Sequence, residues 1–493
     1  METIKIINGR VLDGTSNPEC MKEILIENGM ITGIDDEIKE KGDVIIDASG
    51  LHVCPGFIDI HTHSDFSILN NEHSPEKLLQ GVTTEVVGNC GLGAAPTNEM
   101  IRSILNSLVK DYMYGKEIPE FKSLEDFHSK LSEMGHSINI ASLLPHGNIR
   151  IMSPAGLVAK MPSNDELDEL KAIVEKNMPY AFGLSTGLVY PPGSITPKEE
   201  IAELCKVVSK YGGFYSSHIR NESSGVIGAI DEAIFIGKEG GVPVQISHVK
   251  VAFNNFITRK MLKQFKKARE SGIDITGDVY PYIAGGANLG SIVLPPWVFA
   301  GGAKSIKKTL MNEKKRGKII EDSVKNLMMF AKISPKLQKL LPLWFIKLAL
   351  KFLTKKVMIT STKYTPKYNG MMLNEVLKEY FKEANGIFNQ VLNFLAQEEA
   401  AVSIAIFQES EKKVLIPILK APFVMIGTDS LPGHPRTWGS YPKILGKYVR
   451  EKGILTLPVA INKMTGMPAE RLKLKDRGYL REGYKADITI FDS

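Results

Sequence analysis

The stretch PGFIDIHTHSD, residues 55–65, ends a short apolar run with two histidines that are separated by one residue. Side chains at positions i and i+2 of a strand point to the same face of a sheet. If residues 56–60 form a buried strand, His61 and His63 therefore leave it in the same direction, as two nitrogen ligands on rigid backbone. The same pattern also fits two polar residues that open a loop, so the rest of the chain must decide between them.

Short apolar runs recur along the chain and alternate with longer helical stretches, which is typical of βα units and a parallel sheet. Eight such repeats predict an α/β fold with a (β/α)8 TIM-like barrel, in which functional residues follow the C-terminal ends of the strands. A doubly wound sheet is the competing architecture, but polar residues at nearly every run's end favour the barrel. The runs are GFIDI (56–60), TTEVVG (83–88), INIASLL (138–144), AFGLST (181–186), GFYSS (213–217), PVQIS (243–247), DITGDVY (274–280) and FVMIGT (423–428).

The two ends of the chain have a different texture. Residues 1–54 read as short β-rich runs split by Gly turns, and YKADITIFDS at the end returns to β character. We expect a small, antiparallel β-sandwich domain built from residues 1–54 and 476–493, beside a barrel domain over 55–475. The stretch from about 284 to 372 is too long for one βα loop and predicts a largely helical insertion after the seventh strand, over the barrel mouth.

Composition narrows the class of protein. The chain has 493 residues, a net charge of +6 and 43% hydrophobic residues, which is ordinary for a globular protein. No basic run is interleaved with aromatic residues, so we read the charge as a lysine-rich surface and expect no nucleic-acid partner. The N-terminus METIKIING lacks the features of a secretory signal. Four cysteines without disulfide-framework spacing indicate a reducing cytoplasm; they are Cys20, Cys54, Cys90 and Cys205.

The longest apolar run is LLPLWFIKLALKFL, residues 340–353. It is too short for a transmembrane helix and is broken by Pro342 and two lysines, so no membrane span is expected. Its lysines and apolar residues fit an amphipathic helix. Such a helix packs on a core in most proteins and faces a lipid or partner surface in some.

Further metal-ligand types follow other predicted strands. Cys90 lies in VVGNCG after the second run, His218 in SSHIRNE after the fifth, and His248 in ISHVK after the sixth. Imidazole and thiolate are ligands that Zn²⁺ prefers, and a metal keeps the thiolate deprotonated. With His61 and His63 these residues exceed one tetrahedral shell, so we expect two adjacent metal positions with a shared thiolate.

Asp429, in MIGTDS, follows the eighth run. A carboxylate there can take a proton from an activated water and pass it to a leaving nitrogen, which is the logic of amide hydrolysis. Each residue alone has a structural interpretation, such as a helix cap for Asp429 or a buried apolar thiol for Cys90; their coincidence at five strand ends favours a metal site. His146, after the third run, fits substrate contact and structural hydrogen bonding equally. The histidines away from strand ends are expected to be structural: His52, His73, His128 and His136.

These motifs resemble the amidohydrolase superfamily and, within it, the N-acyl-D-amino-acid deacylases (D-aminoacylases). The resemblance runs from the N-terminal β unit to the last residues and is weakest in the insertion. HxH is typical of the superfamily; the cysteine in GNCG is more specific, because dihydroorotase- and hydantoinase-like relatives use a carboxylated lysine as bridging ligand. The matching motifs are PGFIDIHTHSD, TTEVVGNCG, GLSTGLVYPPG, FYSSHIRNE, QISHVK, DVYPY and GTDSLPGHPRTWGSYPKILGKYVRE.

The resemblance implies a zinc-dependent hydrolase that converts N-acyl-D-amino acids to a carboxylate and a free D-amino acid. It implies that Cys90, His218 and His248 hold a tight zinc, that His61 and His63 line a second, weaker position, and that Asp429 is the general acid/base. The resemblance implies that Lys250 holds the substrate carboxylate and that Arg436 faces the substrate. The residues that it places near the carboxylate are Tyr190, Tyr282 and Ser291.

Two alternatives remain open at this point. One is a related amidohydrolase that acts on a cyclic imide, a dipeptide or an acylated amine; the other is an inactive barrel that serves as a scaffold. Lys250 favours a substrate with a carboxylate next to the scissile amide. Family members continue beyond the point where this chain ends at ADITIFDS, so the small domain is expected to lack strands and to expose a sheet edge.

Overall fold

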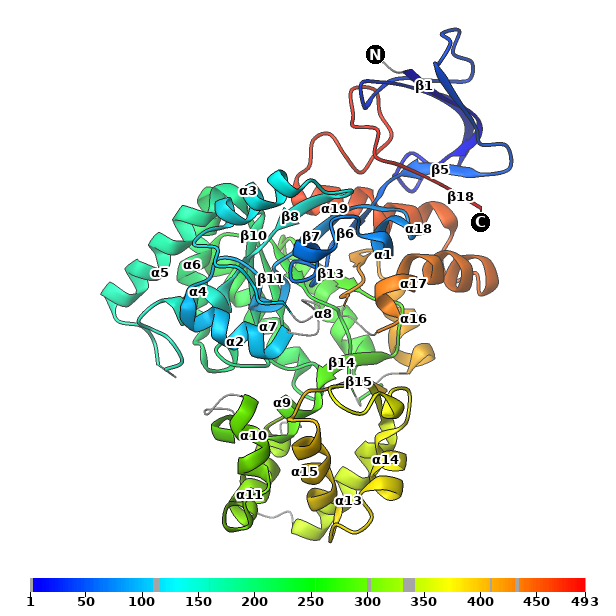
Figure 1. Ribbon diagram of the computed structural model, residues 1–493. Helices are drawn as coiled ribbons and strands as arrows, with labels where there is room; N and C mark the ends of the chain where they lie inside the picture. Colours follow the sequence, from blue (N-terminus) through cyan, green and yellow to red (C-terminus); the bar gives the residue numbers. More distant parts are fainter. Residues whose placement is uncertain are drawn as a thin grey trace.

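The computed structural model describes residues 3–109, 116–158, 160–252, 254–298, 303–330, 342–407, 410–430 and 434–492. The chain has a mixed α/β fold in three parts: a small sheet that holds both termini, a central α/β part, and a third part on the opposite side of the centre from the termini (Figure 1). All four cysteines are free. None of the helices within the described ranges is long and apolar enough to cross a membrane.

The terminal sheet confirms that the last residues pair with the first ones. Its order is β18-β5-β1-β2-β3, and β4 also pairs with β1. The β18–β5, β1–β2 and β2–β3 pairs are antiparallel, whereas β4 and β5 pair with β1 in parallel, so the expected purely antiparallel unit is wrong. The strands are β1 (Thr3–Val11), β2 (Cys20–Glu27), β3 (Met30–Asp35), β4 (Val44–Asp47), β5 (His52–Pro55) and β18 (Ile488–Phe491).

All eight apolar runs form strands of the central part, and every pair is parallel. One sheet has the order β6-β7-β8 and the other the order β17-β13-β12-β11-β10-β9. A parallel bridge joins Thr62 to Ser430, just beyond β6 and β17. The strands are β6 (Phe57–Asp59), β7 (Val82–Val87), β8 (Asn139–Ser142), β9 (Leu144–Pro145), β10 (Gly183–Gly187), β11 (Phe214–His218), β12 (Val244–Ile246), β13 (Ile275–Val279) and β17 (Val424–Ile426).

Helices cover these strands, and α6 shows how a longer helix packs on them with one apolar face. In α6 the residues Ile201, Leu204, Cys205 and Val208 are buried at i, i+3, i+4 and i+7, the spacing of a helix face that packs on a core. The helices are α1 (Pro75–Leu78), α2 (Glu99–Val109), α3 (Leu124–Met134), α4 (His146–Met152), α5 (Asn164–Asn177), α6 (Lys198–Lys210), α7 (Val226–Gly240), α8 (Thr258–Glu270), α16 (Ile416–Leu419), α17 (Arg436–Lys443), α18 (Leu457–Met464) and α19 (Gly466–Leu472).

The third part, residues 284–407, is called the insertion unit below. It has its own hydrophobic core and a three-stranded antiparallel sheet of order β14-β16-β15, which sequence analysis did not predict within its helical insertion at about 284–372. The strands are β14 (Ala284–Asn288), β15 (Val357–Thr362) and β16 (Val402–Phe407). The helices are α9 (Leu289–Val293), α10 (Ala303–Leu310), α11 (Glu313–Phe330), α13 (Leu343–Leu353), α14 (Leu373–Tyr380) and α15 (Ile387–Gln397).

Candidate metal centre

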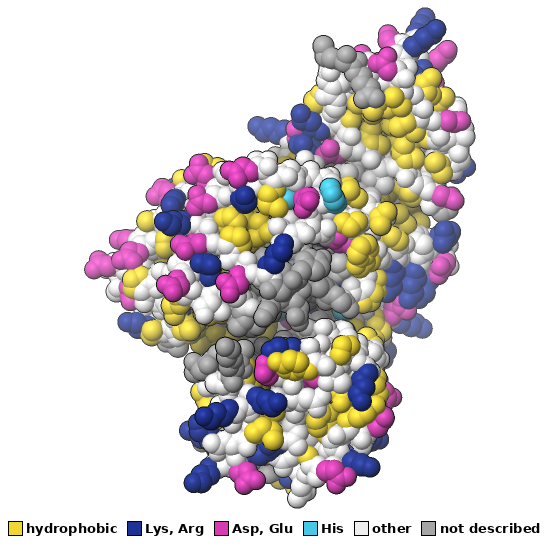
Figure 2. Space-filling model, in the orientation of Figure 1, with side chains coloured by type: hydrophobic (Ala, Val, Ile, Leu, Met, Phe, Trp, Pro, Cys, Tyr) yellow, Lys and Arg dark blue, Asp and Glu magenta, His cyan; other side chains and the backbone are white. Residues whose placement is uncertain are grey.

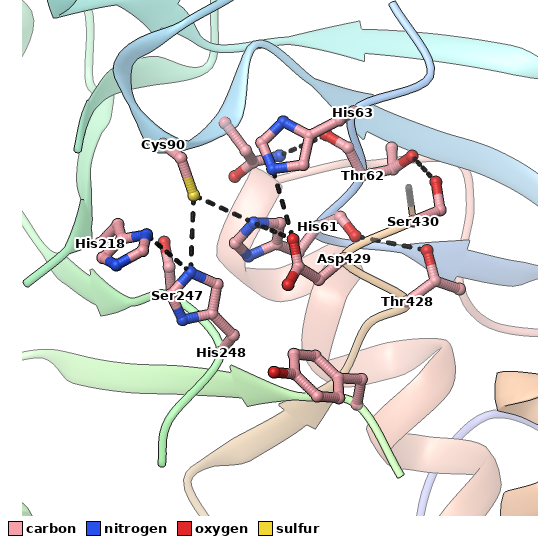
Figure 3. A network of polar contacts seen from close by, with 12 residues as sticks. His61, Thr62, His63, Cys90, His218, Ser247, His248, Thr428, Asp429 and Ser430 are labelled. Atoms are coloured by element: carbon pink, nitrogen blue, oxygen red, sulfur yellow. Dashed lines mark hydrogen bonds and ion pairs between the residues drawn. The ribbon is translucent and has the colours of Figure 1, made fainter. Parts of the chain in front are cut away.

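The five predicted metal ligands lie together at the C-terminal ends of the parallel strands (Figure 3). Their ligand atoms form two groups, each within 4.8 Å, that share one thiol. The first group is His61, His63 and Cys90; the second is Cys90, His218 and His248. Strands that are distant in sequence end at the same edge of the sheet, which brings these side chains together.

The spacing of the donor atoms fits a divalent metal. Cys90 Sγ lies 3.4 Å from His61 Nε2 and 3.6 Å from His248 Nε2. His248 Nε2 lies 3.0 Å from His218 Nδ1. Around a tetrahedral Zn²⁺, a sulfur and a nitrogen ligand are about 3.6 Å apart and two nitrogens about 3.3 Å apart. The thiol and imidazole atoms therefore have both the chemistry and the separation of a zinc site.

Three of the polar residues here have left-handed backbone. The φ angles are 55° at Cys90, 34° at His248 and 46° at Asp429. Such conformations cost about 1–3 kcal/mol each and persist where the surrounding structure enforces them. Gly88 begins the turn GNCG that holds Cys90. Only glycine fits at this position, because a Cβ on Gly88 would lie 2.2 Å from a backbone carbonyl oxygen. The turn therefore aims the Cys90 thiol toward the histidines.

A buried carboxylate, Asp278, and a partly buried one, Glu222, contact the histidines, and sequence analysis assigned neither of them. Asp278 Oδ1 lies 2.9 Å from His61 Nδ1 and accepts from the His248 backbone N–H at 2.8 Å. Glu222 Oε1 lies 2.9 Å from His248 Nδ1. Each contact occupies the ring nitrogen that faces away from Cys90, which leaves Nε2 directed at the thiol. Carboxylates behind metal-binding histidines fix the ring tautomer and raise ligand basicity.

The sequence carries a signal for each of these carboxylates. Asp278 lies inside an apolar strand, where a charged side chain needs a buried partner. Glu222 lies four residues after His218 in the run SSHIRNE.

The charges of the cluster reinforce one another. Burial would raise the pKa of the Cys90 thiol, but the neighbouring His61, His218 and His248 lower it well below its ordinary value. Burial opposes the charged form of His63, yet its contacts with Asp429 and Cys90 raise the pKa of His63 to about 9. A thiolate surrounded by imidazoles is thus favoured at neutral pH, which is the form that binds metal.

Asp429 lies between a histidine and an arginine. Its Oδ1 is 3.3 Å from His63 Nε2, and its Oδ2 is 3.0 Å from the Arg436 guanidinium. Burial would raise the pKa of Asp429, but Arg436 and His63 lower it well below its ordinary value. Arg436 is itself buried and stacks over Tyr280, with its guanidinium carbon 4.7 Å from the ring centroid. Its position next to Asp429 was not predicted.

The other residues that were predicted to bind substrate differ in how directly they contact the metal-ligand residues. Lys250 Nζ is 3.2 Å from Glu222 Oε2 and 3.5 Å from the Tyr280 hydroxyl. The Tyr190 hydroxyl donates to the Cys90 carbonyl at 3.3 Å. The Tyr282 hydroxyl donates to the Pro435 carbonyl at 3.2 Å. Ser291 is in α9, and its side chain is outside the described part of the chain.

His146, which the sequence left open between two roles, bonds to another side chain. Its Nε2 lies 3.1 Å from Glu200 Oε1, and the same carboxylate accepts from Arg150 Nε at 2.9 Å. His146 is fully buried. The contact with Glu200 favours the structural interpretation.

The buried ammonium of Lys77 contacts both the segment that carries His61 and His63 and the segment that carries Asp429. Lys77 Nζ lies 2.6 Å from Asp59 Oδ2 and 3.2 Å from Glu85 Oε2, and all three side chains are fully buried. The same Nζ donates to three hydroxyl groups, those of Thr62, Thr428 and Ser430, at 3.1, 3.3 and 3.3 Å. Thr62 separates His61 from His63, and the other two residues flank Asp429, so one cation holds both loops.

Comparison with known proteins gives matches over the whole chain. The family model "Amidohydrolase family" matches residues 44–104. A D-aminoacylase from Alcaligenes xylosoxydans xylosoxydans is 29% identical over 494 residues, 99% of this chain and 87% of that protein. An N-acyl-D-glutamate deacylase from Bordetella bronchiseptica, solved with zinc and a phosphonate inhibitor, superposes with a TM-score of 0.79 at 27% identity, covering 100% of this chain and 90% of the other.

A D-aminoacylase with a binuclear metal centre superposes with a TM-score of 0.78 at 26% identity, covering 100% and 90% of the two chains. In that enzyme one metal activates and a second attenuates.

Proposed function

The chain belongs to the amidohydrolase family, and on that premise we propose that it is a zinc-dependent enzyme that hydrolyses the amide bond of N-acyl-D-amino acids. The observation that carries this proposal is the pair of donor groups that share the Cys90 thiol, with Asp429 in contact with one of them. The zinc-bound deacylase and the deacylase relatives support both the metal and the substrate class.

Cys90, His218 and His248 would hold the tight metal, and His61 and His63 would line a second, weaker position with Cys90 between them. The activation of a related D-aminoacylase by one metal supports this division. A metal bound here would polarise the scissile carbonyl and make an attacking water more acidic.

Asp429 is the proposed general acid/base. Its ionised form accepts a proton from the attacking water, whose oxygen bonds to the carbonyl carbon and gives a tetrahedral adduct in which the C–N bond is still intact. Asp429 then donates that proton to the leaving nitrogen, which departs as the free amine. Arg436 keeps the carboxylate ionised before the reaction, because their contact lowers the pKa of Asp429. The role proposed for Arg436 is therefore to keep Asp429 ionised, whether or not Arg436 also contacts the substrate.

Lys250 is the proposed partner of the substrate carboxylate. Its ammonium lies beside Glu222, which also contacts His248, so it stands next to the metal ligands. A cation at this place would fix the amide over the metal by binding the α-carboxylate. Tyr190 lies beside the cluster and is a second candidate contact. Tyr282 and Ser291 remain proposals for the same region.

The finer architecture that fits this function is one closed (β/α)8 barrel with a small β-sandwich domain. The two parallel sheets would form the barrel, with β8 and β9 as one interrupted strand; the Thr62–Ser430 bridge supports closure. The corresponding domains would be residues 1–54 with 476–493, and residues 55–475, including an insertion after the seventh strand.

The decisive experiment measures amine release from a panel of N-acetyl, N-formyl and N-succinyl D- and L-amino acids, with and without a chelator. We expect turnover of D-substrates that chelator abolishes and added zinc restores, and loss of turnover in Cys90→Ala and Asp429→Ala. Activity confined to L-substrates or to cyclic imides, or activity unchanged in both variants, would refute the proposal.

A further inference from the structure

Helix α13, residues Leu343–Leu353, lies at the far end of the insertion unit (Figure 1). It exposes a row of large apolar side chains. Trp344 is 65% exposed, Leu348 58% and Phe352 62%, and Phe345 beside them is 44% exposed. Residues at i, i+4 and i+8 lie along one side of a helix. These four side chains are called the α13 face below.

The opposite side of the same helix is fixed to the protein. Ile346 and Leu350 are buried in a small cluster with Val324, Met328 and Phe388. The helix therefore has a buried apolar face as well as the exposed one, and packing against the residues that the structure describes does not account for the exposed Trp344 and Phe352. An exposed row of aromatic and leucine side chains marks a surface that meets another apolar phase.

Lysines flank the α13 face. Lys347 and Lys351 lie along one edge of it, and Lys356 Nζ is 5.7 Å from the centroid of the Phe352 ring. From residue 323 to residue 374 the sequence contains ten lysines and no aspartate or glutamate.

This basic character belongs to the whole insertion unit. Residues 284–407 hold 19 Lys and Arg against 8 Asp and Glu, a net charge of +11, whereas the rest of the chain holds 42 against 47, a net charge of −5. Figure 2 shows Lys and Arg side chains spread over the insertion unit on the face that it displays. The charge of the protein is therefore unevenly distributed, and the positively charged part is the insertion unit, which carries the α13 face.

We propose that the α13 face docks the protein onto an anionic lipid bilayer, with the helix lying in the interfacial plane. Trp, Phe and Leu on one side with Lys at the edge is the composition of helices that bind such interfaces. Anionic headgroups match the +11 charge of the insertion unit, and each lysine near the surface adds about 1 kcal/mol of attraction. At 11 residues the helix is about 16 Å long, too short to span, so it lies on the membrane.

The test is flotation of the full-length, metal-loaded protein with vesicles. Vesicles with about 30% phosphatidylglycerol should bind the protein and pure phosphatidylcholine should bind it at least about tenfold less. Binding to the anionic vesicles should weaken when NaCl rises from about 0.05 to about 0.5 M, because salt screens the attraction.

Two pairs of variants separate the apolar and the charged contributions. Trp344→Ser with Phe352→Ser should lower the partition coefficient at least about tenfold, since two aromatic anchors are lost. Phe256→Ser is the matched control, because Phe256 is 86% exposed elsewhere on the molecule, and it should leave binding unchanged.

For the charges, Lys347→Glu with Lys351→Glu should lower binding to anionic vesicles by at least about tenfold. Lys266→Glu, at an exposed position on α8, is the matched control and should have little effect. Circular dichroism melting of every variant reports folding independently of activity.

The following outcomes would overturn the proposal. They are absence of binding to phosphatidylglycerol vesicles, equal binding by the α13 variants and their controls, or concentration-dependent self-association without lipid that the same variants abolish. The last result would assign the α13 face to a dimer interface. None of these results bears on the hydrolase activity, which is assayed on water-soluble substrates.

Discussion

Replacing Lys77 by methionine tests the buried ion cluster beneath the metal centre. The change keeps the length of the side chain but removes the ammonium that lies 2.6 Å from Asp59 and 3.2 Å from Glu85. Both carboxylates are fully buried, so neither can recover water. Removing one partner of such a cluster costs about 3–5 kcal/mol, because it leaves an uncompensated buried charge. We expect Lys77→Met to lose about that much free energy of unfolding.

A second buried lysine provides the control for this experiment. Lys463 donates to the carbonyls of Ala421 and Val424, and within the part of the chain that the structure describes it forms no ion pair with a carboxylate. Burial lowers the pKa of Lys463 to about 8, so its charge is already disfavoured. Lys463→Met should therefore cost less, about 1–3 kcal/mol, the penalty of unsatisfied carbonyls.

The assay is urea unfolding followed by circular dichroism at neutral pH, with kcat measured on the best substrate of the panel. The loss in Lys77→Met should also lower kcat, since Lys77 bonds Thr428 and Ser430 on either side of Asp429. Adding Glu85→Gln to Lys77→Met should recover part of the stability by removing one orphaned charge. A Lys77→Met protein as stable as the Lys463→Met control would refute the reasoning.

Three further predictions follow from the site and from the surface. Asp429→Asn should retain zinc, measured by elemental analysis, and lose about 10²–10⁴-fold in kcat, the contribution of general acid–base catalysis; loss of metal instead would make Asp429 chiefly a ligand. Glu222→Gln should weaken zinc affinity about 10–100-fold in a chelator competition, because Glu222 orients His248; unchanged affinity would contradict this. Hydrogen bonds from Lys447 and a second lysine lower the pKa of Glu411 to about 2 from its ordinary 4.5, so its contribution to stability is present above pH 4.5 and is lost as pH falls toward 2; Glu411→Gln should cost about 1–2 kcal/mol at pH 7 and little at pH 2, in acid titrations of unfolding.

The strands and the donor set could be predicted from sequence because each depends on local information. An apolar run of five to seven residues predicts a strand, and a metal-ligand residue type at its end predicts the ligand as well. His61 and His63 follow β6 directly, and Cys90, His218 and His248 follow or end their own strands. Once the strands are parallel, their C-terminal ends meet, so the cluster follows from topology without any knowledge of long-range contacts.

The partners of those residues could not be predicted, because they depend on which chain segments become neighbours. The contact of Asp278 with His61 joins residues 217 positions apart. The place of Asp278 in an apolar strand indicates that it needs a buried partner, but nothing local says that the partner is His61. Arg436 lies only seven residues after Asp429, yet a motif match assigned it to the substrate rather than to the carboxylate. Strand β14 of the insertion unit was missed for the same reason. Its sequence AGGAN has little β propensity, and it is a strand because β16 pairs with it more than a hundred residues later.

The net charge of the whole chain conceals a division that the fold makes visible. A value of +6 over 493 residues reads as a uniformly lysine-rich surface, but it is the sum of an insertion unit at +11 and a remainder at −5. Such a molecule has an electric dipole that orients the insertion unit toward an anionic surface before contact. The positive charge and the apolar α13 face therefore lie on the same part of the protein. Added salt should therefore lower the rate of vesicle association more steeply than it raises the rate of dissociation. Electrostatic attraction acts on the approach to the vesicle, whereas the insertion of Trp344 and Phe352 into the bilayer controls the release. Stopped-flow measurements that place most of the salt dependence in dissociation would separate the two effects and assign the attraction to short-range lysine contacts alone.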